Sequence, residues 1–276
     1  PFTQLNTAYP ATAYLKGFLN TLSIDSRQID LSIEVMTTLF SKQYLEIIFE
    51  YAAANKNTFD DNAHRIYNLR SHYIQTIDNV ISFLQGHQPT LAYKICERNY
   101  LPEASKFDNL DELDFSFGNL GIVDKAKHLA TLYLEDLGDF ITHQIDGHFG
   151  FNRYAESIAR AASDFGVIEQ ELNKPNTIIT DITLKILDQQ LQKYKPDVVC
   201  FTIPFPGNLF GALKCCQWIK QHCPEIKTIA GGGYVNTELR NVMDEKVFNY
   251  FDLICLDDGE LPIQCVIEYI SGKRAI

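Results

Sequence analysis

The pattern of apolar and polar positions divides the chain into three blocks. Residues 1–34 open with a loop, continue with a helical stripe over 11–21, and close on 28–34, where polar and apolar residues alternate as in a half-buried strand. Residues 35–165 carry long helical patterns. Residues 166–276 return to short apolar runs that alternate with amphipathic helices.

The middle block is predicted to be entirely helical. Its apolar stripes recur at helical spacing, and the expected helices span residues 35–54, 59–85, 90–99, 123–145 and 152–163. An acidic loop is expected at 102–121. We interpret residues 35–165 as a helical insertion or subdomain.

The last block has the pattern of a parallel α/β sheet. Its strongest strand signal is the apolar run 198–203, which is typical of a central parallel strand. Further strands are expected at 226–230 and 251–256, and the expected helices span 181–194, 209–222, 236–244 and 261–271. Together with a helix and a strand from the first block, they predict an open, flavodoxin-like (Rossmann-like) parallel sheet with helices on both faces, interrupted by the helical block.

Composition narrows the classes of function. With 24 basic and 35 acidic residues the net charge is −11, so a nucleic-acid partner is not expected. No apolar run reaches the roughly 18 residues that a spanning helix needs, and there is no basic-then-apolar leader, so we expect a cytoplasmic protein. The first residue is Pro1, and we interpret the chain as a piece of a longer protein.

The cysteines point to reduced thiols and not to a disulfide framework. Their number, seven, is odd, and their spacings match no zinc or iron–sulfur pattern. They are Cys96, Cys200, Cys215, Cys216, Cys223, Cys255 and Cys265. We therefore predict no metal site.

Candidate ligand-binding residues follow the predicted strands. Ligands of open α/β sheets bind outside the carboxyl ends of the strands. Four segments with turn or glycine signals are expected there: 5–10, 202–208, 231–236 and 257–260. The chain contains neither a GxGxxG sequence nor a P-loop, which weakens the usual dinucleotide and nucleoside triphosphate interpretations.

These segments resemble parts of a cobalamin-binding domain. Thr202-Ile203-Pro204 and Gly231-Gly232 resemble the Ser-x-Leu and Gly-Gly elements of that family, with Thr and Pro as departures. Asp258-Gly259-Glu260 resembles the end of the cobalamin domain that precedes radical SAM domains. The opening Pro1 to Leu19 is similar to the first loop and helix of the same family.

The chain thus resembles the N-terminal cobalamin-binding region of a cobalamin-dependent radical SAM protein. The resemblance covers residues 1–34 and about 166–270, and it implies a discontinuous cobalamin-binding α/β domain formed by 1–34 plus 166–276. The implied cofactor-binding residues are Asn6, Thr7, Tyr9, Thr202, Pro204, Phe205, Gly231, Gly232, Gly233, Tyr234, Asp258, Gly259 and Glu260. Among these, Tyr9, Phe205 and Tyr234 could offer flat surface to a corrin ring or could simply pack.

The same resemblance places the chemistry outside this chain. The barrel that holds a [4Fe–4S] cluster and S-adenosylmethionine would follow residue 276 and would be the main partner, acting on an unknown small-molecule substrate by methyl transfer or other radical chemistry. Whether this chain belongs to an enzyme stays open, and the fragment alone is expected to be inactive. The helical block would cover the ligand or contact the substrate domain.

One departure concerns the cobalt ligand. Other cobalamin domains carry a ligating His after the first strand, whereas residues 5–10 contain none, so base-off cobalamin without a His ligand is expected. The partial look-alike Asp146–Gly150 is interpreted as a helix-ending turn. Two alternatives stay open: a nucleotide- or flavin-binding domain, and an interaction module without a ligand.

Overall fold

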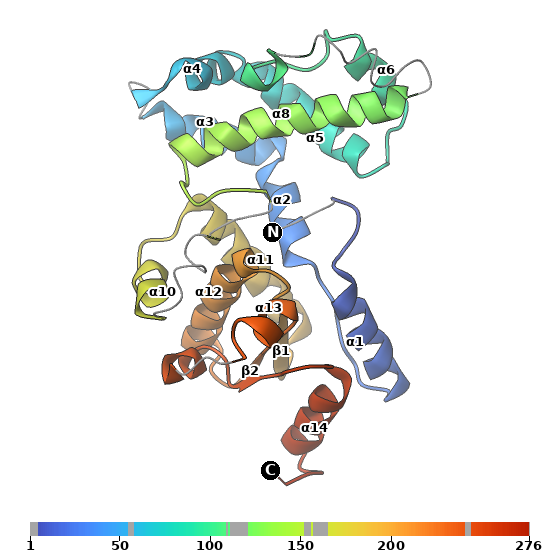
Figure 1. Ribbon diagram of the computed structural model, residues 1–276, viewed down its shortest axis with the longest axis vertical. Coiled ribbons are helices and arrows are strands. Elements are labelled where there is room, and N and C mark those ends of the chain that lie inside the picture. The colour runs from blue at the N-terminus through green and yellow to red at the C-terminus, as the bar shows by residue number, and fades with distance from the viewer. Residues whose placement is uncertain are drawn as a thin grey trace.

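The computed structural model describes residues 5–54, 58–108, 110, 121–151, 156, 165–240 and 244–275. Within them the chain is a mostly helical α/β protein with a small three-stranded parallel sheet (Figure 1). Its elements in chain order are α1 (Pro10–Thr21), α2 (Leu31–Leu39), α3 (Lys42–Ala53), α4 (Asp61–Asn68), α5 (Arg70–Leu84), α6 (Leu91–Cys96), the 3₁₀ helix η2 (Ser105–Phe107), α8 (Ile122–Gln144), α10 (Phe165–Leu172), α11 (Ile178–Tyr194), β1 (Val198–Thr202), α12 (Pro206–His222), β2 (Lys227–Gly231), α13 (Gly233–Thr237), the 3₁₀ helix η3 (Glu245–Asn249), β3 (Leu253–Ile254) and α14 (Glu260–Ile270).

The sheet has the strand order β1-β2-β3. β1 pairs with β2 in parallel from Val198 opposite Lys227 to Thr202 opposite Gly231, and Ile229 of β2 lies opposite Leu253. The prediction that residues 198–203 form a central strand is wrong, because β1 lies at one edge and β2 is central. The outer edge of β1 therefore has no neighbouring strand among the described residues.

The predicted strand at 28–34 is also wrong, because α2 begins at Leu31. The Asp30 carboxylate accepts a hydrogen bond from the Ile33 backbone N–H at 3.2 Å and caps the helix. Leu31, Val35 and Leu39 then face one side at helical spacing. In the described part of residues 5–34 the chain therefore contributes helices and loops, and no strand, to the fold.

The described part of the helical block is helical, as predicted, but the boundaries of its helices differ from the predicted ones. The long helix expected at 123–145 is α8, whereas the stretches 35–54 and 59–85 are each broken into two helices. Ser41 caps the second helix of the first pair by accepting from the Tyr44 N–H at 3.3 Å. The predicted helix at 152–163 lies outside the described residues except for Glu156, and much of the acidic loop lies outside them too.

The buried apolar residues form three clusters, and α11 contributes to two of them. The larger core fills the helical block and includes Ile179, Ile182 and Ile186 from the first half of α11. The second half of α11 contributes Leu187 and Leu191 to a smaller cluster with Cys215 and Ile219 of α12. Figure 1 shows the helical block above the sheet, with α2 and α11 at the junction.

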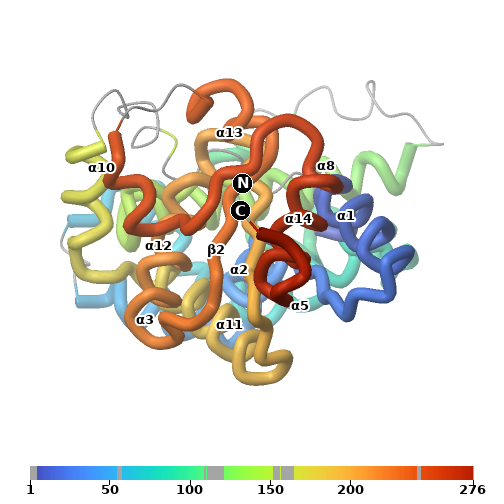
Figure 2. Tube along the Cα trace, turned by 90° about the horizontal axis from the view of Figure 1, so that it is seen from below, coloured from blue at the N-terminus to red at the C-terminus, as the bar shows by residue number. Residues whose placement is uncertain are grey.

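The first and last helices lie beside each other on the flank of the α/β region. A Cβ at Gly259, just before α14, would be 3.1 Å from Leu15 of α1, and Figure 2 shows the two helices together. No helix in the described part of the chain is long and apolar enough to cross a membrane.

Candidate functional site

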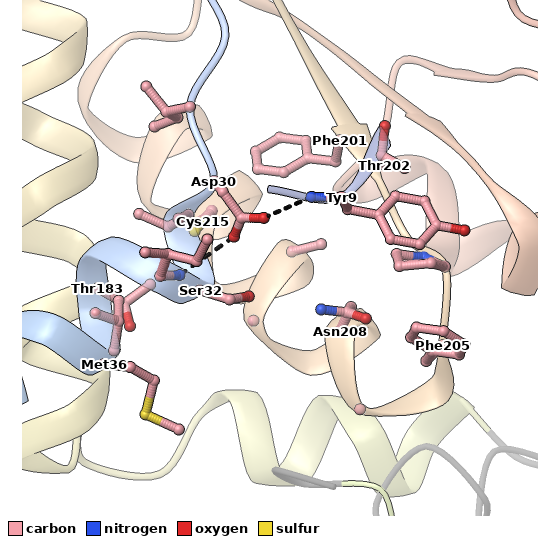
Figure 3. Close-up of a pocket in the computed structure, with 18 of the residues that line it drawn as sticks. Tyr9, Asp30, Ser32, Met36, Thr183, Phe201, Thr202, Phe205, Asn208 and Cys215 are labelled. Carbon is pink, nitrogen blue, oxygen red and sulfur yellow. Dashed lines mark hydrogen bonds between the residues drawn. The ribbon is translucent and has the colours of Figure 1, made fainter. Parts of the chain in front are cut away.

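A cavity of about 280 Å³ lies along the outer edge of β1 (Figure 3). Four consecutive β1 residues, 199–202, line it. Because successive strand residues point to opposite faces of a sheet, a cavity that touches all four runs along the strand's free edge. It lies between the sheet and the start of the helical block.

The walls come from parts of the chain that are far apart in sequence. The lining residues are Thr7, Tyr9, Thr12, Ile29, Asp30, Leu31, Ser32, Ile33, Val35, Met36, Phe149, Gly150, Phe151, Ile179, Thr183, Leu187, Val199, Cys200, Phe201, Thr202, Pro204, Phe205, Gly207, Asn208, Gly211, Ala212 and Cys215. Most of these side chains are apolar, which is typical of small-molecule pockets.

Asp30 fixes the wall opposite β1. One carboxylate oxygen caps α2, and the other accepts a hydrogen bond from the Tyr9 backbone N–H at 3.0 Å (Figure 3). The side chain of Gln28 adds a second link by donating to Thr12 Oγ1 at 2.6 Å. Asp30 therefore holds the segment before α1 against the start of α2.

Aromatic side chains lie at the cavity near the end of β1. The rings of Tyr9 and Phe205 are 6.1 Å apart between centroids and meet edge to face at 79°. Their side chains are 40% and 45% exposed, respectively. Exposed aromatic rings at a cavity suit a flat ligand, because they bury large apolar area on contact.

The polar groups of the cavity are neutral except for Asp30. The side-chain hydroxyls of Ser32 and Thr202 have no hydrogen-bond partner among the described residues, and Oδ1 of Asn208 is buried without one. None of the lining residues of the described structure is Lys, Arg or His. The cavity therefore suits a largely uncharged group that offers hydrogen bonds.

The two cysteines in the lining give no sign of covalent chemistry. Burial raises the pKa of the Cys215 thiol to about 12, so that it is protonated at neutral pH. Cys200 lies on the free edge of β1 and is exposed, but desolvation of its thiol likewise raises the pKa, to about 12. Among the described residues no group of three or more His, Cys, Asp or Glu side chains could hold a metal ion.

The structure brings part of the predicted site together. Thr7, Tyr9, Thr202, Pro204 and Phe205 all line the cavity. The other predicted residues lie outside its lining: Asn6, Gly231, Gly232, Gly233, Tyr234, Asp258, Gly259 and Glu260.

Gly232 has a role in the fold itself. Its φ of +107° lies in a region that side chains disfavour, and a Cβ there would be 2.9 Å from the backbone N and O of Ile203. The Ile203 N–H donates to the Gly231 carbonyl at 2.7 Å, and the Tyr234 N–H donates to the Ile203 carbonyl at 3.0 Å. The glycines therefore let the loops after β1 and β2 meet, which needs no ligand.

Tyr234 belongs to the core of the α/β region. It is 8% exposed and packs in a cluster with Leu209 and Leu213 of α12, where burial raises its pKa. Of the two roles considered for it, the structure shows packing.

The acidic turn before α14 is remote from the cavity lining. Asp257 pairs with the Arg240 guanidinium at 2.6 Å, and this hydrogen bond lowers the pKa of Asp257. Asp258 is exposed, and Glu260 is the first residue of α14. The helix N-cap is Gly259, without a side-chain cap, so Asp258 does not cap α14.

Sequence reasoning missed Asp30 and Ser32 as site residues, and it placed Asn208 at the end of the expected segment 202–208 without naming it as a site residue. An Asp followed three residues later by a helical stripe is a capping signal, and it competes with the strand alternation that we read at 28–34. The contributions of α2, α11 and Phe149 have no local signal, because they depend on how the helical block docks.

Comparison with known proteins identifies no family. No family model matches the chain, and no solved structure matches it. A molybdenum cofactor sulfurase of Drosophila willistoni is 31% identical over 90 residues, which cover 31% of this chain and 11% of that protein. The chain thus spans about a tenth of the curated relative it matches.

Proposed function

We propose that this chain is a cobalamin-binding module, and that the cavity beside β1 receives the nucleotide tail of the cofactor. The observation that carries the proposal is the meeting of Thr7 and Tyr9 with Thr202, Pro204 and Phe205 around one cavity. These residues come from the two chain segments that resemble a cobalamin-binding domain. We further propose that residues 1–34 and 166–276 form one flavodoxin-like domain, interrupted by the helical block.

The size of the cavity supports the tail of the cofactor as its occupant. At about 280 Å³ it is slightly smaller than most small-molecule pockets, which range from about 300 to 1,000 Å³. An aromatic base with its sugar is of this order, whereas a corrin macrocycle is not. Tyr9 and Phe205, exposed at the cavity, would then contact the part of the ligand that stays outside.

The charges favour cobalamin over a polyphosphate nucleotide. Sites for nucleoside di- and triphosphates commonly use Lys or Arg, and no such side chain is among the lining residues of the described structure. The cobalamin tail carries an uncharged benzimidazole and a single phosphodiester. Bound cobalamin would supply a transferable methyl group to a radical SAM domain that we place after residue 276.

Retention of the cofactor tests the proposal. The chain is incubated with hydroxocobalamin, and in parallel with FMN and ATP, then desalted, and its visible and ultraviolet spectra are recorded. We expect retained corrin bands. In Ser32→Phe the added ring would fill the cavity, so the corrin bands should be lost.

Thr131→Phe is the matched control, because Thr131 is exposed on α8 and does not line the cavity. It should retain cobalamin like the parent. Retention of flavin or nucleotide in place of corrin would favour the first alternative, and retention of nothing would favour the interaction module. Equal retention of cobalamin by Ser32→Phe would show that the ligand binds elsewhere.

A further inference from the structure

Among the lining residues that the structure describes, Asn208 alone has a buried side-chain polar atom that makes no hydrogen bond. It lies in the first turn of α12, after the N-cap Phe205, and its Oδ1 has no hydrogen-bond partner in the described structure. Figure 3 shows its side chain projecting into the space between Ser32 and Phe205. The backbone N–H of Asn208 is already used, donating to the Phe205 carbonyl at 3.0 Å.

An unpartnered buried acceptor favours a ligand that brings a donor. Leaving such an oxygen unpaired is costly, whereas a ligand N–H that reaches it regains the lost hydrogen bond. The amide also carries two N–H donors, so a ligand edge with a donor beside an acceptor would use both of its ends. Asn pairs in this way with the amine and ring nitrogen of adenine.

The other polar groups of the cavity do not distinguish between the two kinds of base. The Ser32 and Thr202 hydroxyls can each donate or accept, so they match either kind of base. The side chains of Thr7, Thr12, Asp30 and Thr183 also line the cavity, but they already make hydrogen bonds within the protein. Discrimination between two flat bases of similar size would therefore depend on the amide.

Building on the function proposed above, we infer that Asn208 makes the cavity selective for the lower base of the cofactor. It would favour a cobamide whose lower base is a purine with an exocyclic amine beside a ring nitrogen. A cobamide with 5,6-dimethylbenzimidazole offers only a ring nitrogen acceptor and methyl groups, and it leaves Asn208 Oδ1 unpaired.

The test compares two cobamides that differ only in the lower base. Adeninylcobamide and cobalamin, both in the aquo form, are titrated into the chain, and dissociation constants are measured from the visible spectrum. We expect adeninylcobamide to bind about tenfold more tightly, the size of effect that follows from satisfying one buried polar group. In Asn208→Leu, which keeps the number and branching of the side-chain heavy atoms and removes the amide, the ratio should approach one.

Gln217→Leu is the matched control on the same helix, because Gln217 does not line the cavity; it should keep the preference. Asn208→Ala serves if Asn208→Leu does not fold. Equal binding of both cobamides by the parent, or a preference that persists in Asn208→Leu, would overturn the role of Asn208 and leave the proposed function intact.

Free bases, without the corrin ring, distinguish failure of the proposed function from failure of the role of Asn208. If neither cobamide is retained, the proposed function fails, and saturation-transfer NMR with free adenine and free 5,6-dimethylbenzimidazole still examines the cavity. A stronger adenine signal with the parent than with Asn208→Leu supports the assignment of Asn208. Equal adenine signals from the two proteins overturn it.

Discussion

At the scale of one residue, Gly232 combines a backbone conformation that favours glycine with a close contact to the Ile203 backbone. Replacing it by Ala should lower the free energy of unfolding by about 1–3 kcal/mol, because the φ of +107° is strained for Ala and the new Cβ would meet the Ile203 backbone. Gly17→Ala is the control. Gly17 lies in α1 with no atom within 4 Å of its Cβ position, so that change should be neutral or stabilising. Urea titrations measure both, and equal stability of the two variants would contradict this account.

Asp136 on α8 is a buried carboxylate whose titration should affect stability. It accepts hydrogen bonds from the backbone N–H groups of Ala104 and Lys106, both at 3.0 Å, and burial raises its pKa to about 6. An unfolded Asp titrates near 3.9. The native state therefore binds the proton more tightly, and this contribution to stability is full below about pH 4 and is lost as the pH rises through 6.

Asp136→Asn isolates that contribution, because the amide does not titrate while the neighbours Asp139 and Lys106 remain. Between pH 4.5 and 7 the parent should lose stability relative to the variant by on the order of 1 kcal/mol, a figure that allows for partial solvation. Unfolding free energies at several pH values provide the measurement. A difference that stays flat, or rises with pH, would show that Asp136 is not the group responsible.

At the scale of elements, Asp30 links a helix cap to the cavity wall. Asp30→Ala should lower the unfolding free energy by about 1–2 kcal/mol through loss of the α2 cap, and it should weaken cobalamin retention because the Tyr9 N–H loses its acceptor. Asp30→Ser should regain most of the stability. Asp60→Ala removes the cap of α4, where Asp60 accepts from the Ala63 N–H at 2.7 Å. It should cost similar stability and leave retention unchanged; parallel loss of retention would refute the link.

Helix α2 shows where prediction from sequence fails. Residues 28–34 alternate over only a few positions, and the capping carboxylate with the stripe Leu31, Val35 and Leu39 specifies a helix more strongly. The strands at 198–203 and 226–230 were predictable because they are short apolar runs between helices. Their order in the sheet was not, because it depends on pairing across the chain.

For the whole molecule, the cavity depends on the docking of the helical block against the sheet. Thr202 ends a predictable strand and Pro204 and Phe205 follow it, so their place at the sheet edge could be expected. Asn208 lies one turn further along, and its importance emerges only with the buried, unpaired oxygen. The side chains of α2 and Phe149 reach the cavity through packing that no local pattern encodes.

Because α11 contributes both to the core of the helical block and to the cluster that it forms with α12, we expect the two parts of the molecule to unfold together. Ile182 is 2% exposed in the core of the helical block, and Leu191 on the same helix packs beneath the sheet. Trp218 is the single tryptophan and lies on α12, so its fluorescence follows the α/β region, whereas far-ultraviolet circular dichroism follows mainly the helices. Urea transitions by the two probes should coincide.

Ile182→Ala should shift both midpoints downward together, with a loss of about 2–5 kcal/mol. Ile47→Ala, on the exposed side of α3, should shift neither. Two separated transitions, or a shift in the circular dichroism alone, would mean that α11 does not couple the cores and that the cavity wall can unfold while the sheet remains intact.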